Sequence, residues 1–255
     1  MIDLTNKHAL IAGGMNKLTG GITARLQVAG AGVTLAHSPA DQAKARQLAN
    51  ENGAKTQTFD FDQPKNLADQ FNALDSLDIA IITPRWYETA DFTSTSASDW
   101  NAALRENFEQ MTLTAQAAAA KMIQQAGEGR GGRIIFLSSV ASLLPLLETS
   151  VVGTSLAALR PIAKMAAVDL GKHGITVNIV AAGWVETEHN EAHLQAGHAQ
   201  IEAGIPAGRI GTPEQIGDAC CFLASDLAAY ITGVVLPVDG GYLLTPAAGN
   251  TPYPS

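Results

Sequence analysis

The sequence has two regions whose side chains could take part in catalysis or metal binding, and Tyr87 lies in the first. It follows an apolar run that is typical of a strand, and its phenol could act as a general acid. Such a group normally works with a base placed beside it, and the local sequence offers none. A Trp-Tyr pair in a loop more often packs an interface or plugs a cavity, and Trp86 directly precedes Tyr87. Both interpretations stay open.

The second place is a polar segment between Glu186 and Gly204. Two of its histidines are four residues apart, so on a helix they would share one face. The potential ligands in this segment are Glu186, Glu188, Glu191, His189, His193 and His198. They do not form the HExxH pattern of a zinc helix. We therefore predict an exposed polar segment and no metal site.

The elements that would position these groups are short apolar runs alternating with longer helical patterns. The predicted strands are His8–Ala12, Val33–His37, Ala54–Phe59, Leu77–Ile82, Arg133–Leu137, Ile175–Val180 and Val234–Val238. Predicted helices run to about Ala29, over Asp41–Asn50, from Pro64, over about Ser98–Gln125, over about Val151–Lys172, and from Pro213 after Thr212 as N-cap. A Gly-rich turn at Gly127–Gly132 precedes the fifth strand.

This alternation predicts the α/β class, with a doubly wound parallel sheet of the Rossmann type. The strands are continuous apolar runs, as burial on both faces requires. We predict a single domain over residues 1–244 and a Pro-rich, extended tail over residues 245–255. Ligands of such folds bind beyond the carboxyl ends of the strands.

Composition excludes several classes of function. The 255 residues carry a formal net charge of −8, which argues against nucleic acid and anionic membrane as partners. No stretch reaches the ~18 apolar residues that a membrane helix needs. The two cysteines, Cys220 and Cys221, are adjacent and poorly placed to pair, which favours a reducing compartment. We expect a cytoplasmic protein.

Several motifs, in order along the chain, resemble those of the short-chain dehydrogenase/reductase family. They are Ala9–Gly14, Asp60, Trp100 and Asn107, Ile134–Val140 (IIFLSSV), His173–Asn178 (HGITVN), Arg209–Glu214 (RIGTPE) and Ile231–Gly241 (ITGVVLPVDGG). The resemblance covers roughly residues 5–242 and implies the family fold. A fold does not by itself establish a function.

The positions that bind a nicotinamide dinucleotide in the family are altered here. Its first turn has three glycines, and the matching residues are Gly13, Lys17 and Thr19. Lys17 could bind a phosphate as a point charge, or the loop could close over an empty site. His37 stands where the family usually has a ribose-binding Asp. Asp60 keeps the family residue after the third strand.

The loop after the fourth strand is altered as well. The family's Asn-Asn-Ala-Gly becomes Ile82-Thr83-Pro84-Arg85. We expect either no NAD(P) binding or weak binding.

The catalytic set is altered most. The resemblance implies a Ser, a Tyr 13 residues later, a Lys four further on, and an Asn on the long helix. Ser139 and Asn107 match, but Val152 stands at the Tyr position and Leu156 at the Lys position. Valine and leucine cannot transfer protons. The two retained residues are therefore expected to be relict, with Tyr87 as the one candidate substitute.

Three hypotheses follow for the function. The first is a non-catalytic structural or regulatory subunit that pairs with an active dehydrogenase paralogue, as in some heteromeric members of the family. The second is an NAD(P)-dependent oxidoreductase of carbonyl/alcohol or 3-oxoacyl/3-hydroxyacyl type, with a non-standard site. The third is a repurposed non-redox enzyme with a small-molecule ligand. We favour the first, as a homo-oligomer or hetero-oligomer.

Overall fold

The computed structural model describes residues 2–125 and 131–245. Within these residues the strands form one parallel sheet in the order β3-β2-β1-β4-β5-β6-β7. The strands are β1 (His8–Gly13), β2 (Gly32–His37), β3 (Lys55–Thr58), β4 (Ile79–Thr83), β5 (Gly132–Ser139), β6 (Ile175–Ala182) and β7 (Val235–Val238). The strand order reverses between β1 and β4, which places the ligand crevice of this fold at their carboxyl ends. The predicted doubly wound sheet is confirmed.

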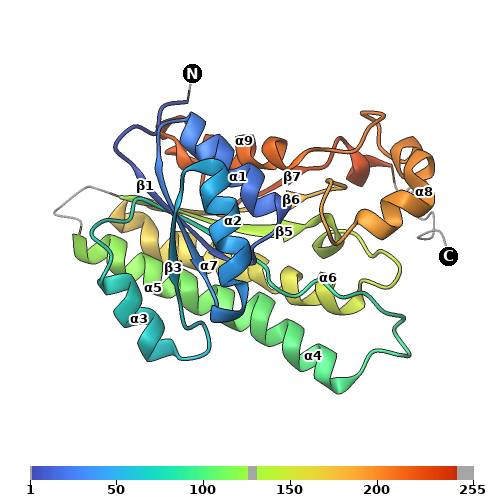
Figure 1. Ribbon diagram of the computed structural model, residues 1–255, viewed down its shortest axis with the longest axis horizontal. Helices are drawn as coiled ribbons and strands as arrows, with labels where there is room; N and C mark the ends of the chain where they lie inside the picture. Colours follow the sequence, from blue (N-terminus) through green and yellow to red (C-terminus); the bar gives the residue numbers. More distant parts are fainter. Residues whose placement is uncertain (1, 126–130, 246–255) are drawn as a thin grey trace.

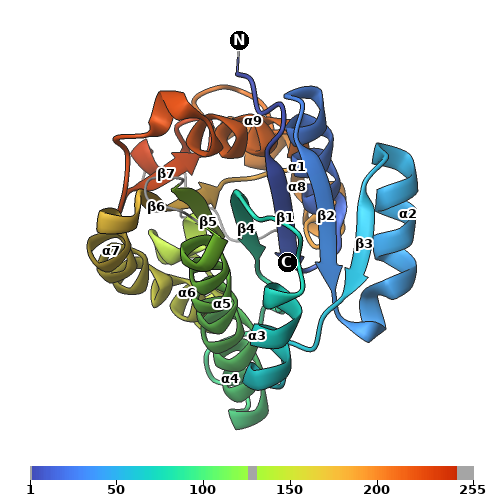
Figure 2. The same cartoon turned by 90° about the vertical axis from the view of Figure 1, so that its left-hand side faces the viewer.

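Helices cover both faces of the sheet (Figures 1 and 2). They are α1 (Lys17–Val28), α2 (Gln42–Asn52), α3 (Pro64–Asn72), α4 (Ala97–Leu104), α5 (Gln110–Gln125), α6 (Ser150–Ala157), α7 (Leu159–Leu170), α8 (Glu191–Ala203) and α9 (Pro213–Ala224). Residues of α1, α2 and α9 form one buried cluster with the sheet, and residues of α3, α5, α6 and α7 form the other. Neighbouring residues of β1 divide between the clusters: Ala9 and Ile11 pack on the first face, Leu10 and Ala12 on the second. This alternation is the reason why the inner strands are largely apolar on both faces, whereas β3 at the edge of the sheet (Lys55–Thr58) is polar.

The predicted helix over Val151–Lys172 is in fact two helices, α6 and α7, that meet at Ala158. Pro161 explains the break, because a proline has no N–H to donate to the carbonyl four residues earlier. That carbonyl belongs to Ala157, and it accepts a hydrogen bond from Arg160 Nε at 3.4 Å instead. Arg160 is exposed, and its side chain bonds to the backbone at the helix break. By length and composition alone Ser150–His173 could cross a membrane, but much of it is buried in the core.

The predicted helix over Ser98–Gln125 is also interrupted. It begins after Ser96, whose side chain accepts from the Asp99 N–H in a capping box. A π-helical turn at Arg105–Glu109 then separates α4 from α5. Such turns are common at functional sites. This one carries Asn107.

A helix that the sequence did not predict, α8, lies in the polar segment after β6. It packs through Leu194 and Ile201 on a small cluster that includes Val140 and Tyr242. Its backbone is non-helical at Gly197. The segment is therefore folded over the loop that follows β5, while Glu186, Glu188 and Glu191 are exposed, as predicted. The predictions for residues 127–130 and for the tail beyond Thr245 lie outside the described residues.

Candidate functional site

The carboxyl ends of β1, β4, β5 and β6 surround a cavity of about 140 Å³. Ser139 of β5 lies on one side of it, and Val152 and Leu156 of α6 lie on another. Trp184 and Thr187 of the β6–α8 segment, together with Tyr87 after β4, complete part of the wall. The structure thus brings together Ser139, Val152 and Leu156, the positions that the family resemblance implied, and adds Tyr87 from the loop after β4.

Val152 and Leu156 are core residues as well as cavity residues. Val152 is 6% exposed and Leu156 is fully buried, and both belong to the cluster under α5, α6 and α7. Across the cavity, the Ser139 hydroxyl accepts a hydrogen bond from the Ala141 N–H at 3.2 Å. That contact leaves the Ser139 proton able to point into the cavity.

Tyr87 reaches this cavity from the β4 loop and stacks on His189, with ring centroids 4.1 Å apart and planes 20° apart. Its hydroxyl oxygen is buried and has no hydrogen bond of normal geometry among the described residues. Burial raises the pKa of Tyr87, and the nearby Asn16 side chain offsets only part of that effect. Burial also lowers the pKa of His189, while Glu188 opposes this shift and Lys44 adds to it. Burial therefore favours the uncharged form of both rings.

Asn107 has no hydrogen-bonding capacity left for a proton relay. Its Oδ1 accepts from the Arg85 N–H at 3.2 Å and from the Trp86 N–H at 3.1 Å. Its Nδ2 donates to the Trp86 carbonyl at 2.8 Å and to the Ser155 hydroxyl at 3.3 Å. An amide has two donors and two acceptor sites, so all four are used. In this structure Asn107 holds the loop after β4.

The turn after β1 is closed upon itself. Gly13 has φ = +129°, and a Cβ there would lie 2.1 Å from the Thr83 carbonyl oxygen, so only glycine fits. Thr19, at the family's third glycine position, is buried and donates from its hydroxyl to the Gly14 carbonyl at 2.6 Å. Asn16 caps α1 by accepting from the Thr19 N–H at 3.1 Å. Thr19 therefore stabilises the turn from within.

Helix α1 begins where a Rossmann fold binds the phosphates of its dinucleotide. Here the Lys17 backbone N–H donates to both carboxylate oxygens of Glu188, each at 3.1 Å. Glu188 comes from the segment between β6 and α8. The Lys17 side chain is exposed. A carboxylate of the chain itself thus accepts a hydrogen bond at the helix start where Rossmann folds bind phosphate.

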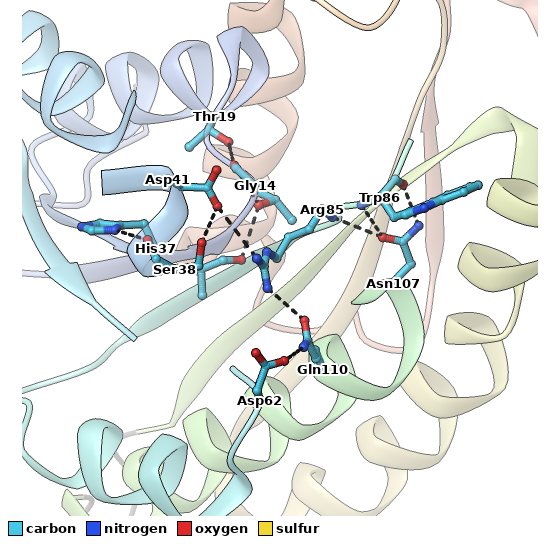
Figure 3. A network of polar contacts seen from close by, with 12 residues as sticks. Gly14, Thr19, His37, Ser38, Asp41, Asp62, Arg85, Trp86, Asn107 and Gln110 are labelled. Atoms are coloured by element: carbon cyan, nitrogen blue, oxygen red, sulfur yellow. Dashed lines mark hydrogen bonds and ion pairs between the residues drawn. The ribbon is translucent and has the colours of Figure 1, made fainter. Parts of the chain in front are cut away.

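The adenosine side of the crevice is crossed by Arg85, which stands at the last glycine of the family's Asn-Asn-Ala-Gly (Figure 3). Its guanidinium donates to Gln110 Oε1 at 3.0 Å, lies 3.9 Å from the Asp41 carboxylate, and lies over the Phe61 ring at 5.4 Å. Ser38 donates to the same Asp41 carboxylate at 2.7 Å. One side chain therefore links the loops that follow β2, β3 and β4.

The other predicted cofactor residues have partners within the protein. His37 is buried, and its Nδ1 lies 2.8 Å from the Ser38 carbonyl. Asp60 accepts from the Asp62 N–H at 3.1 Å and from Asn66 Nδ2 at 2.9 Å, which secures the start of α3. Among the described residues, no group of three or more His, Cys, Asp or Glu side chains could hold a metal ion.

Sequence reasoning missed Arg85 and Glu188 as site residues. Arg85 was noticed only as a departure from the family loop, and Glu188 only as a neighbour of histidines. The signal for Arg85 was present, because a long side chain at a glycine position must fill the space that the glycine leaves. Nothing in the sequence connects Glu188 to Lys17, 171 residues away.

Comparison with known proteins identifies the family. Residues 18–243 match the family model described as enoyl-(acyl carrier protein) reductase. The 3-oxoacyl-[acyl-carrier-protein] reductase of Aquifex aeolicus is 30% identical over 94% of this chain and 98% of its own length. The chain therefore belongs to the short-chain dehydrogenase/reductase family.

Solved structures agree with this assignment. A short-chain type dehydrogenase/reductase from Mycobacterium marinum is 33% identical with a TM-score of 0.82, and the match covers 94% of this chain and 97% of that one. A candidate 2-deoxy-D-gluconate 3-dehydrogenase from Agrobacterium tumefaciens, solved with bound NADP, is 29% identical with a TM-score of 0.83, and the match covers 95% and 98%. The relatives are thus named as oxidoreductases, and one of them holds a dinucleotide.

The family implies such a dinucleotide, and the residues present here do not fit it in this conformation. A phosphate at the start of α1 would compete with Glu188 for the Lys17 N–H. Arg85, at a position where the family has glycine, reaches toward Asp41 and Gln110 and so places a long side chain among the loops after β2, β3 and β4. Nor do Val152 and Leu156 offer a group that could bond a ribose.

Proposed function

We propose that this chain is a non-catalytic, structural or regulatory subunit of the family, which acts in an oligomer with an active dehydrogenase paralogue. The observation that carries the proposal is the wall of the cavity formed by Val152 and Leu156. These apolar, buried side chains stand where the family has its proton donor and its lysine. Losing a general acid typically costs ~10²–10⁴ in rate, and residues that act as a unit fail together.

The closed crevice supports the same proposal. Glu188 and Arg85 would both have to move before a dinucleotide could enter, so we expect NAD(P) binding to be absent or weak. The surface of α7 supports association, because Met165 and Val168 are 63% and 80% exposed on it. Since both cysteines are free and buried, we expect the subunit in the cytoplasm.

The test has two parts. Calorimetric titration with NADH and with NADPH should show no binding in the micromolar range. Micromolar binding of either would refute the proposal that the crevice is closed to a dinucleotide. The chain should also be co-expressed with the dehydrogenase paralogue encoded nearest to it, and the mass of the purified complex measured. The subunit role would be overturned if the chain is a stable monomer at micromolar concentration and does not bind the paralogue.

A second candidate function is an oxidoreductase of carbonyl/alcohol or 3-oxoacyl type with a non-standard site, and the names of the relatives favour it. Tyr87 is the observation in its support, because its buried hydroxyl borders the cavity that Ser139 also lines. Burial raises its pKa, which keeps the phenol protonated but makes it a weaker acid, and this counts against the candidate. The assay is oxidation of NADPH with a panel of ketones and 3-oxoacyl thioesters. Turnover that disappears in Tyr87→Phe would establish this candidate and refute the first.

A non-redox function of the same cavity is the remaining alternative. The volume of about 140 Å³ is close to that of the engineered cavity of about 150 Å³ that binds benzene. A ligand of that size would fit under the Tyr87–His189 stack without a dinucleotide. Binding of a small ring compound in the absence of NAD(P), measured by calorimetry, would support this alternative.

A further inference from the structure

We propose that Glu188 is an internal substitute for a phosphate group, and that its contact with Lys17 fastens the segment Val185–Ala203 over the cavity in the absence of any nucleotide. This inference rests on the proposed closed crevice. In this proposal the Glu188 carboxylate takes the position at the start of α1 that a nucleotide phosphate would otherwise take. We call this contact the latch.

The chemistry of the latch is that of an anion at a helix N-terminus. The first N–H groups of a helix lack partners within the helix, and the helix dipole favours negative charge there. In α1 the Asn16 side chain satisfies the Thr19 N–H, and both oxygens of Glu188 face the Lys17 N–H. A charge-assisted bond of this kind is roughly twice as strong as a neutral one.

Two further contacts hold the same segment in the same position. His189, the next residue, stacks on Tyr87 from the β4 loop. Beyond it, Leu194 and Ile201 of α8 pack beside Val140 and Tyr242. The latch therefore lies at one end of a segment whose other end is anchored by apolar burial. Releasing Glu188 should loosen the beginning of the segment without unfolding the domain.

Arg85 complements the latch on the other side of the crevice. Its Nε is buried and has no partner among the described residues, and its distance of 3.9 Å from Asp41 is long for an ion pair. It therefore fills the space of an adenosine without making a full set of bonds. Glu188 and Arg85 together close the two halves of the crevice with side chains of opposite charge.

The first experiment is hydrogen–deuterium exchange on the full-length protein without nucleotide or substrate. Glu188→Ala should raise exchange at residues 185–190, the beginning of the segment, and at the start of α1 by about fivefold to tenfold, as expected for the loss of one charge-assisted bond. Glu188→Gln should give a smaller increase, because an amide oxygen still accepts but carries no charge. Glu186→Gln is the matched control: it removes the same charge two residues earlier, from an exposed side chain, and should leave exchange unchanged. Equal exchange in Glu188→Ala and the wild type, or an equal effect of Glu186→Gln and Glu188→Gln, would overturn the latch.

The second experiment asks whether a phosphate replaces the carboxylate. Inorganic pyrophosphate at constant ionic strength should raise the melting temperature of Glu188→Ala and leave that of the wild type unchanged. Stabilisation of both proteins alike, or of neither, would overturn the idea of an internal substitute. Neither experiment measures activity or assembly. The latch can therefore fail while the subunit role stands, and turnover by the wild type would refute the subunit role without deciding the latch.

Discussion

Replacing Asn107 tests whether this residue is structural here, as its contacts indicate, or part of a proton relay, as its position in the family implies. Asn107→Ala removes four hydrogen bonds at once, two of them to the N–H groups of Arg85 and Trp86. The Trp86 carbonyl also loses its partner, whereas the Ser155 hydroxyl keeps its bond to the Val152 carbonyl at 3.0 Å. Each buried polar group left without a partner costs about 1–3 kcal/mol.

The size of the effect follows from how many of these groups water can reach. Arg85 and Trp86 are only partly buried, so we count about two groups as unsatisfied and expect a loss of about 2–6 kcal/mol in the free energy of unfolding. For a domain of this size that corresponds to a fall in melting temperature of about 4–24 °C.

The assay is thermal unfolding followed by circular dichroism, with Asn101→Ala as the control. Asn101 lies on the neighbouring α4 and is exposed, so its replacement should change the melting temperature little. If Asn107→Ala and Asn101→Ala have the same melting temperature, then Asn107 does not hold the β4 loop. The reasoning that it has no capacity for a relay would then be refuted.

Three further predictions concern rescue, packing and the thiols. Val152→Tyr combined with Leu156→Lys should not restore NADPH-dependent reduction of 3-oxoacyl thioesters, because the crevice stays closed and the lysine would be buried; substantial turnover would show that the nucleotide site is intact. Gly21→Ala should destabilise the fold by about 1–3 kcal/mol, since its Cβ would lie 2.4 Å from Pro213 Cβ, whereas Gly171→Ala meets nothing within 4 Å and should be neutral in the same denaturant titration. Burial raises the pKa of Cys220, and of Cys221 to about 12, so both thiols stay protonated at neutral pH and should resist a thiol reagent until the protein is unfolded; rapid labelling of the native protein would contradict the buried placement.

Most of the sheet could be predicted from the sequence because the inner strands carry their own signal, whereas the edge strand β3 (Lys55–Thr58) has no apolar residue. Apolar runs such as Ile134–Leu137 are short, continuous and bounded by turn residues, so they identify buried parallel strands without tertiary information. The start of α9 could also be predicted from the sequence. Pro213 occupies the first turn, and the Gln215 side chain accepts from the Thr212 N–H at 3.1 Å. These features depend on residues that are neighbours in the chain.

The features that the sequence did not reveal depend on contacts between distant residues. Helix α8 has only two large apolar residues, Leu194 and Ile201, and its packing partners include Tyr242, so its stability comes from tertiary burial rather than from its own periodicity. The sequence alone was enough to predict that Val152 and Leu156 replace the catalytic pair. It could not predict the path of the Arg85 side chain, because its partners Asp41, Phe61 and Gln110 come from three other parts of the chain.

The position of Arg85 has a consequence for how this chain can evolve. If the crevice is closed as proposed, a tyrosine regained at position 152 or a lysine at position 156 confers nothing while Arg85 spans the nucleotide side. Loss of Arg85 alone takes a cation from Asp41 and Gln110 and gives no activity in return. Return to the ancestral chemistry then needs several substitutions together, none favoured by itself. Selection would act on the outer surface of such a lineage while its interior drifts, and orthologues should vary more around the cavity than on the faces that meet other chains.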